Sequence, residues 1–166
     1  ALCLLWSKFI LEIFDQNADM AAFIRRVLGM ALVGDNLEHA LFVLWGGGWN
    51  GKDTLLGLIA KTLGPLAGPI QAEFLLDQTR TRSSAGPSAD TMSLRGRRLA
   101  WASETNEGRR LDAGRVKSLT GDKFLTGRSP YGRRDVMFPV THTLFLLTNH
   151  KPHVPADDFA LWKRLH

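Results

Sequence analysis

One stretch constrains the fold more than any other part of this sequence: an apolar run, a glycine-rich loop, and a lysine that opens an amphipathic helix. The apolar run is Leu41–Trp45, the loop spans residues 46–51, and the segment from Lys52 to Leu63 has helical spacing of apolar residues. A short apolar run bounded by glycines predicts a strand buried on both faces. Gly64 and Pro65 mark the end of the helix. A strand that leads through a tight loop into a helix is typical of α/β domains.

The rest of the chain extends this pattern. Apolar runs at Arg97–Ser103 and Thr143–Thr148 predict two more buried strands, separated from the first by helices and long excursions. We therefore expect an α/β fold with a mostly parallel central sheet flanked by helices. Helical spacing over residues 1–38 predicts an N-terminal helical segment, and residues 124–138 predict a β-hairpin around a Ser-Pro-Tyr-Gly turn. Residues 77–93 are rich in Ser, Thr, Gly and Pro and predict a long, mobile surface loop.

The loop has the G-x-x-x-x-G-K spacing that cradles phosphates. Glycines let backbone N–H groups turn towards phosphate oxygens, and the following helix offers its positive end to the anion. Lys52 would reach the β- and γ-phosphates of a nucleotide. A chance glycine-rich turn is the alternative, and the strand before and helix after the loop argue against it. The candidate nucleotide contacts are Gly46, Gly48, Asn50, Gly51, Lys52, Asp53 and Thr54.

The loop departs from its usual pattern at one position. The residue after the lysine is normally Ser or Thr, whose hydroxyl helps to hold Mg²⁺, and here it is Asp53. A carboxylate could contact Mg²⁺ or its waters, or it could repel the phosphates. Thr54 comes next, but it points about 100° away on a helix and is not an obvious substitute.

Two polar residues follow the other predicted strands. Glu104 ends one strand and Asn149 follows the other. Beside a phosphate loop, an acid at a strand end serves the Mg²⁺ shell or polarises the attacking water. An amide at the next strand end could orient that water. Strand-ending Glu and Asn are also ordinary turn residues, and Lys52 is what favours the functional interpretation.

Charge and cysteine content limit the kinds of partner and the cellular compartment that suit this chain. The net charge is +5, and residues 95–134 alone hold eleven Lys or Arg against four Asp or Glu. Such a basic block favours a surface that meets phosphates or a solvated basic face, and composition leaves both open. The single cysteine excludes an internal disulfide and a cysteine-based zinc site, and it fits the reducing cytosol. The apolar runs are far shorter than the ~20 residues that span a bilayer, so no membrane association is expected.

In their order and spacing, the segments of this chain resemble the superfamily 3 helicases of the AAA+ class. They resemble in particular the C-terminal helicase domain of phage and plasmid primase-helicases of the poxvirus-like primase group. The matching segments cover nearly the whole chain: Leu28–Asp35, Gly46–Lys52, Gly96–Leu99, Ser103–Thr105, Lys117–Asp122, Arg128, Phe138–Pro139, Thr148–Pro152 and Leu161–Arg164. The resemblance implies a P-loop NTPase core over residues 39–166, with a β-hairpin before the sensor strand. We expect this core to continue beyond residue 166 in a larger protein.

The resemblance also implies roles. The protein would be a hexameric motor that uses ATP and Mg²⁺ to translocate on DNA. Lys52 would be the Walker A lysine, Glu104 the Walker B acid and Asn149 the sensor, with Asp53 and Glu104 as candidate metal ligands. Arg164 would be the arginine finger that completes the site of a neighbouring protomer. Asp53 departs from the family, in which Ser or a small residue is usual.

The implied DNA contacts surround the predicted hairpin, which would face the central channel of the ring. They are Lys117, Arg128, Tyr131, Arg133 and Arg134. Guanidinium groups contact phosphates and a tyrosine can stack on a base. Lys117 and Arg128 could instead serve the nucleotide interface, and Tyr131 could equally be a turn residue that packs locally.

The expected setting is the cytoplasm of a bacterial host, with a primase fused to or associated with the motor. Two other functions stay open at this point. A nucleotide-dependent DNA-binding or assembly module with little hydrolysis would suit Asp53. A small-molecule kinase is disfavoured because the sequence offers neither a lid nor an acceptor site.

Overall fold

The computed structural model describes residues 3–35, 37–78, 88–104 and 106–166, and of Glu104 only the backbone. At its centre lies a four-stranded sheet in the order β1–β6–β3–β2. The strands are β1 (Leu41–Trp45), β2 (Ala67–Pro69), β3 (Leu99–Glu104) and β6 (Thr143–Thr148). All three pairings are parallel, which confirms the predicted α/β fold with a parallel sheet.

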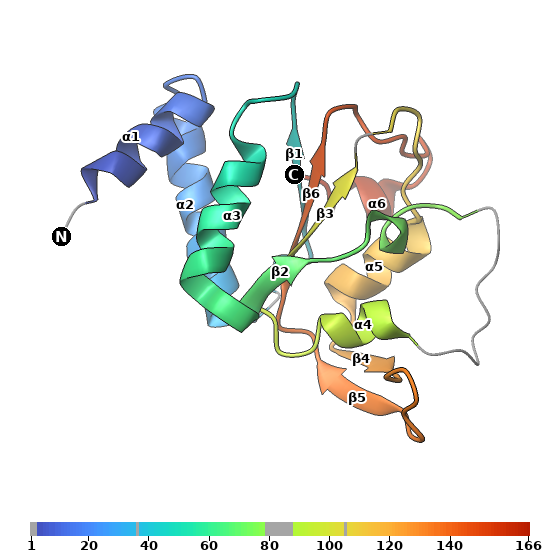
Figure 1. Cartoon of the computed structure of the whole chain (residues 1–166). Helices are drawn as coiled ribbons and strands as arrows, with labels where there is room; N and C mark the ends of the chain where they lie inside the picture. The colour runs from blue at the N-terminus through green and yellow to red at the C-terminus, as the bar shows by residue number, and fades with distance from the viewer. Residues whose placement is uncertain (1–2, 36, 79–87, 105) are drawn as a thin grey trace.

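Helices cover both faces of this sheet (Figure 1). On one side lie α1 (Leu4–Ile13), α2 (Ala18–Val33) and α3 (Lys52–Leu63), so the predicted N-terminal helices share a core with the helix after the loop. On the other side lie α4 (Ala89–Ser93), α5 (Ala113–Gly121) and α6 (Phe159–Trp162). Short 3₁₀ turns, η1 (Gly64–Leu66) and η2 (Ala72–Phe74), flank β2. Strands β4 (Phe124–Gly127) and β5 (Val136–Pro139) pair antiparallel as the predicted hairpin.

Strand β6 is the centre of the core. All six of its residues are buried. Leu144 and Leu146 pack into the core on the α5 side, whereas Phe145 and Leu147 pack into the core made with α1, α2 and α3. A central parallel strand has no solvent-facing side, and this is why its sequence is a continuous apolar run rather than an alternating one.

The strand register sets where a site can form. Trp45 of β1 and Glu104 of β3 both pair with Thr148 of β6, so the carboxyl ends of these three strands lie level at one edge. In open α/β sheets ligands bind outside this edge. The hairpin leads through residues 140–142 into the start of β6 and lies at the other end of the molecule, at the bottom of Figure 1.

The last residues of the chain extend the sheet on the side of β1 away from β6. The backbone N–H of Leu41 donates to the Arg164 carbonyl at 2.7 Å, and the N–H of Val43 donates to the His166 carbonyl at 2.8 Å. Leu165 bridges Leu41 in the parallel sense. Arg164 therefore lies beside the amino end of β1.

Three expectations need correction. Strand β2 was not predicted, because Gly68 and Pro69 are poor strand formers and are tolerated here only at the sheet edge. Part of the predicted loop over residues 77–93 is helix α4, whose Thr91 is buried; residues 79–87 lie outside the described residues. Strand β1 is not buried throughout, since Trp45 is 54% exposed at the open edge, with the Lys151 ammonium 4.4 Å from the centre of its ring.

Candidate active site

The loop between β1 and α3 has the backbone geometry of a phosphate cradle. Gly51 has φ 84°, and a Cβ there would lie 2.6 Å from Cγ2 of Ile13, so glycine is required where α1 packs against the loop. Gly46 has φ 156°, at the limit of the left-handed region. At Gly47 and Gly48 a Cβ would meet no atom within 4 Å. Side-chain packing therefore does not fill the space beside these two residues.

Lys52 opens α3 and turns its ammonium back into the loop. Nζ donates to the carbonyls of Gly46 at 2.7 Å and Gly47 at 3.0 Å, and to Oδ1 of Asn50 at 2.8 Å. Partial burial lowers the pKa of Lys52, and the nearby Asp53 carboxylate works in the opposite direction. The lysine is thus held at the loop mouth by weak, neutral acceptors, which phosphate oxygens can replace.

Asn149 reaches the same ammonium from another strand. Its Oδ1 lies 3.5 Å from Nζ of Lys52, across 97 positions of sequence. The chain turns sharply after β6 because the Thr148 hydroxyl donates to the His150 carbonyl and accepts from the His150 N–H, at 2.6 and 3.2 Å. The structure therefore brings Lys52 and Asn149 together. The backbone of Glu104 ends β3 level with Thr148, and its side chain lies outside the described residues.

The oxygen donors at this edge fit a metal-bound nucleotide. Asp53 and Thr54 are exposed in the first turn of α3, directly after Lys52, whose ammonium lies 3.5 Å from Oδ1 of Asn149. Mg²⁺ prefers oxygen ligands and is usually held by one or two carboxylates together with phosphates. Across the described ranges, no three His, Cys, Asp or Glu side chains gather into an all-protein metal site. The set suits Mg²⁺ bound with phosphates rather than alone.

Arg164 lies away from this edge. It follows α6 beside the amino end of β1, and the length of that strand, about 13 Å, separates it from the loop of its own chain. Nη1 donates to the Ala160 carbonyl at 2.7 Å, while Nε is buried with no partner among the described residues. Arg164 lines an open groove of about 770 Å³, together with Glu38, His39, Gly114, Lys117, Ser118, Gly121, Asp122 and Lys163. Arg164 is therefore distant from the loop of its own chain, and its expected role as an arginine finger stays a prediction.

Lys117 lies in this groove and joins two helices. Its Nζ is 2.7 Å from Oδ2 of Asp158, and Oδ1 of Asp158 accepts from the Leu161 N–H at 3.0 Å, capping α6. The hydrogen bond from Lys117 holds the pKa of Asp158 below its usual range. Of the two predicted roles for Lys117, the nucleotide interface suits its place on α5 better than DNA contact on the hairpin. Both roles stay predictions.

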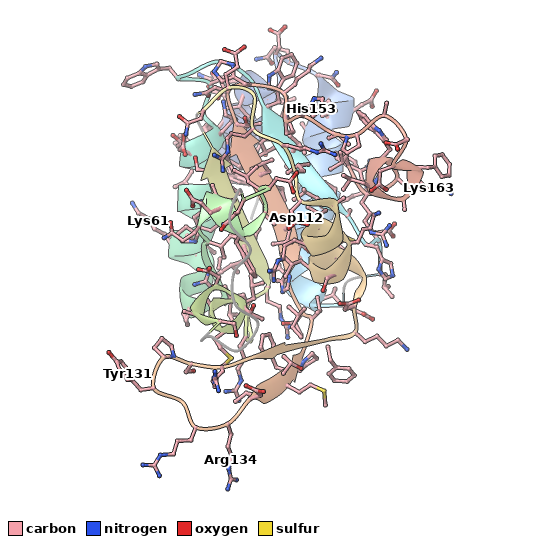
Figure 2. The ribbon with its side chains drawn as sticks, turned by 90° about the vertical axis from the view of Figure 1, so that its right-hand side faces the viewer. Lys61, Asp112, Tyr131, Arg134, His153 and Lys163 are labelled. Atoms are coloured by element: carbon pink, nitrogen blue, oxygen red, sulfur yellow. The ribbon has the colours of Figure 1, made fainter. Side chains whose placement is uncertain are left out.

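The hairpin tip points away from the body of the molecule. Figure 2 shows Tyr131 and Arg134 at the end opposite His153, which follows the sensor strand. Tyr131 is fully exposed and has φ 64°, so the alternative of local packing is wrong. Arg133 is exposed as well. The tip presents an aromatic ring and guanidinium groups to solvent.

The base of the hairpin is tied to the residue before α4. The Arg128 N–H donates to Oγ of Ser88 at 2.8 Å, and the Ser88 N–H donates to the Arg128 carbonyl at 3.0 Å. Nε of Arg128 lies 4.0 Å from Oδ1 of Asp135. Sequence reasoning missed this tie, and no local pattern could have shown it, because the two segments are 40 positions apart.

In sequence the chain is similar to proteins of large DNA viruses that are named as helicases and primases. No family model matches it. It is 31% identical over 155 residues to "Putative helicase L207/L206" of Acanthamoeba polyphaga mimivirus, covering 93% of this chain and 16% of that protein. It is 28% identical over 165 residues to "Putative primase C962R" of African swine fever virus, covering 96% of this chain and 17% of that protein. "Putative helicase 022R" of Frog virus 3 is 27% identical over 161 residues, with 95% and 16% covered.

Solved structures support the fold. The apo "A form" of the NrS-1 C-terminal region superposes with a TM-score of 0.66 at 14% identity, covering 95% of this chain and 35% of that one. A structure of NrS-1 residues 305–718 gives the same TM-score at 15% identity, covering 92% and 35%. At this level of identity the likeness concerns the fold alone.

The sequence relatives come from viruses of eukaryotes, so the expected phage or plasmid source and bacterial host stay predictions. None of the described helices combines the length and apolarity needed to cross a bilayer. The chain spans about a sixth of the length of the curated relatives it matches. As the sequence resemblance predicted, this chain is a relative of the helicase and primase proteins of large DNA viruses.

Proposed function

We propose that this chain is the ATP-hydrolysing motor core of a DNA replication helicase. One observation carries the proposal: Lys52 and Asn149 converge at the sheet edge where β3 ends in Glu104. That edge belongs to a sheet in which β6 lies between β1 and β3. Relatives named as helicases and primases support a replicative role over other uses of a phosphate loop.

The proposed chemistry follows from the positions of the residues. Loop N–H groups and the amino end of α3 bind the phosphates, and Lys52 pairs with the β- and γ-oxygens. Asn149, already within 3.5 Å of the ammonium, orients a water towards the γ-phosphate. Glu104 would polarise this water and, with Asp53, would hold Mg²⁺. A bound Mg²⁺ would supply positive charge to offset the negative charge that grows on the phosphates.

A second molecule would complete the site. Arg164 lies about the length of β1 from its own loop, so we assign it to the loop of a neighbouring protomer. A positive charge supplied across an interface stabilises the transition state by orders of magnitude in rate. Such a head-to-tail contact closes into a ring, and we propose a hexamer. The exposed hairpin tip would then contact single-stranded DNA in the central pore.

Asp53 favours one other function. A carboxylate where a hydroxyl is usual could slow hydrolysis while leaving nucleotide binding intact. The chain would then be a nucleotide-dependent DNA-binding or assembly module. Relatives named as primases also support a fused or associated primase in either case.

The test is ATPase activity with Mg²⁺, with and without single-stranded DNA. Lys52→Ala should lower DNA-stimulated turnover by about 100-fold or more, because the lysine that pairs with the transferred phosphate is lost. Lys61→Ala is the matched control, since Lys61 lies in the last turn of the same helix and is exposed. Negligible turnover in the wild type and Lys52→Ala alike, with nucleotide binding retained, would favour the assembly module. Full activity in Lys52→Ala would exclude both functions.

A further inference from the structure

The residue after the loop lysine carries a negative charge where the phosphate-binding pattern has a neutral hydroxyl. Asp53 is the second residue of α3, and its side chain is exposed. It lies in the first turn of α3, next to the loop at which the phosphates of the proposed nucleotide would bind. A phosphate-binding site rarely gains from a carboxylate, so the substitution must change what the site accepts.

Without a metal, Asp53 opposes nucleotide binding in two ways. Its charge offsets part of the charge of Lys52: burial lowers the pKa of the Lys52 ammonium, and the Asp53 carboxylate partly opposes this. An acidic side chain in the first turn also takes up part of the positive end of the helix, which phosphates would otherwise use. The loop therefore offers less net positive charge than a loop with Ser at this position.

With a divalent cation the same charge acts in the other direction. A cation between the carboxylate and the phosphates is attracted to both, and a carboxylate is a stronger ligand for Mg²⁺ than a hydroxyl. The amide oxygens of Asn50 and Asn149 both lie within 3.5 Å of the Lys52 ammonium and already accept hydrogen bonds from it. Asp53 is thus the exposed oxygen ligand of the first helical turn best able to bind the ion.

We propose that Asp53 makes this loop prefer nucleoside triphosphate as its divalent-metal complex over the metal-free nucleotide. The inference rests on the proposed nucleotide site and adds which form of the nucleotide that site binds. Nucleotide with its metal ion therefore binds more tightly than nucleotide alone. A loop with Ser at this position would discriminate much less between metal-bound and metal-free nucleotide.

Calorimetric titration of the chain with ATPγS, in MgCl₂ and separately in EDTA, tests this preference. The wild type should bind at least about tenfold more weakly in EDTA, the factor expected from one unit-charge repulsion a few ångströms away. Asp53→Asn keeps the size of the side chain and removes its charge. In this variant affinity in EDTA should rise by about tenfold, so that the ratio between the two conditions shrinks.

Asp19→Asn is the matched control, because Asp19 is likewise the exposed second residue of a helix, α2. It should keep the wild-type ratio. Equal wild-type binding in MgCl₂ and EDTA, or an unchanged ratio in Asp53→Asn, would overturn the inference while leaving the proposed function in place. Absence of ATPγS binding in both conditions would overturn the proposed function together with it.

Discussion

At the scale of single residues, the loop depends on a glycine whose replacement by any other residue would destabilise the fold. Gly51 is the N-cap of α3, has φ 84°, and lies against Ile13 at the end of α1. An L-residue in the left-handed region costs about 1–2 kcal/mol, and the contact with Ile13 adds overpacking. We expect Gly51→Ala to lower the free energy of unfolding by about 2–4 kcal/mol, as measured by urea denaturation.

Gly57 provides the control for this measurement. It lies inside the same helix, and a Cβ there would meet no atom within 4 Å. Gly57→Ala should raise stability by about 0.5–1 kcal/mol, because alanine loses less backbone entropy in a helix. Equal effects of the two substitutions would contradict the packing of α1 against the loop.

A buried histidine makes stability depend on pH. His142 is 1% exposed, and its Nε2 donates to the Leu119 carbonyl at 3.2 Å; Nδ1 has no partner within the described structure. Burial lowers the pKa of His142 to about 4; the Leu119 hydrogen bond opposes this and the charge of Arg97 adds to it. The histidine is therefore neutral in the folded protein at physiological pH.

Between the unfolded pKa of 6.5 and the folded pKa of about 4, the unfolded chain binds one more proton here. The contribution of His142 to the free energy of unfolding is fully present above pH 6.5. It is lost as the pH drops through this window, by about 3 kcal/mol in total. Urea denaturation across the window should show this loss in the wild type. His142→Gln has no titrating group, so its pH dependence should be smaller by that amount. Parallel pH profiles would exclude His142 as the cause.

At the scale of elements, helices and buried strands were predictable where the sequence carries a local signal. The Gly64-Pro65 stop, and the continuous apolar run of β6, each fix one element by themselves. Strand β2 and helix α4 were missed because their residues have weak propensities, and tertiary pairing decides their conformation. The cap of α2 could have been found: the side chain of Asn17, placed before an apolar periodic segment, accepts from two N–H groups.

The hairpin is the element whose proposed role is easiest to test. Arg133 and Arg134 are exposed at its tip, so Arg133→Ala with Arg134→Ala should leave the fold intact. Single-strand binding should weaken roughly tenfold at low salt, and the slope of log K against log salt should fall by about 1.4 for two lost phosphate contacts. Fluorescence anisotropy with a labelled oligonucleotide at several salt concentrations measures both.

Arg25→Ala with Arg26→Ala is the matched control, because these two arginines are adjacent and exposed on α2. This pair should change neither the affinity nor the salt slope. If both double variants weaken binding equally, DNA contacts the basic surface in general, and the hairpin has no special part.

At the scale of the whole molecule, the sequence predicted one edge of the site but not its separation from the other functional groups. The proximity of Lys52 and Asn149 could be predicted from the sequence, because the carboxyl ends of parallel strands share an edge. The position of Arg164 beside the amino end of β1 depends on pairing between distant segments, for which the chain carries no local signal. The same holds for the Lys117–Asp158 contact between α5 and α6.

This separation predicts that Lys52 and Arg164 act in different protomers of one site. Lys52→Ala and Arg164→Ala should each be inactive alone, with wild-type stability checked by urea denaturation. Mixed in equal amounts, they should recover part of the DNA-stimulated ATPase, because about a quarter of the interfaces in randomly mixed rings then combine an intact lysine with an intact arginine. Mixing Lys52→Ala with the Lys52→Ala, Arg164→Ala double variant is the control, since no interface there has an intact lysine. Full activity of Arg164→Ala alone, or no recovery in a mixture that still assembles, would remove Arg164 from the shared site.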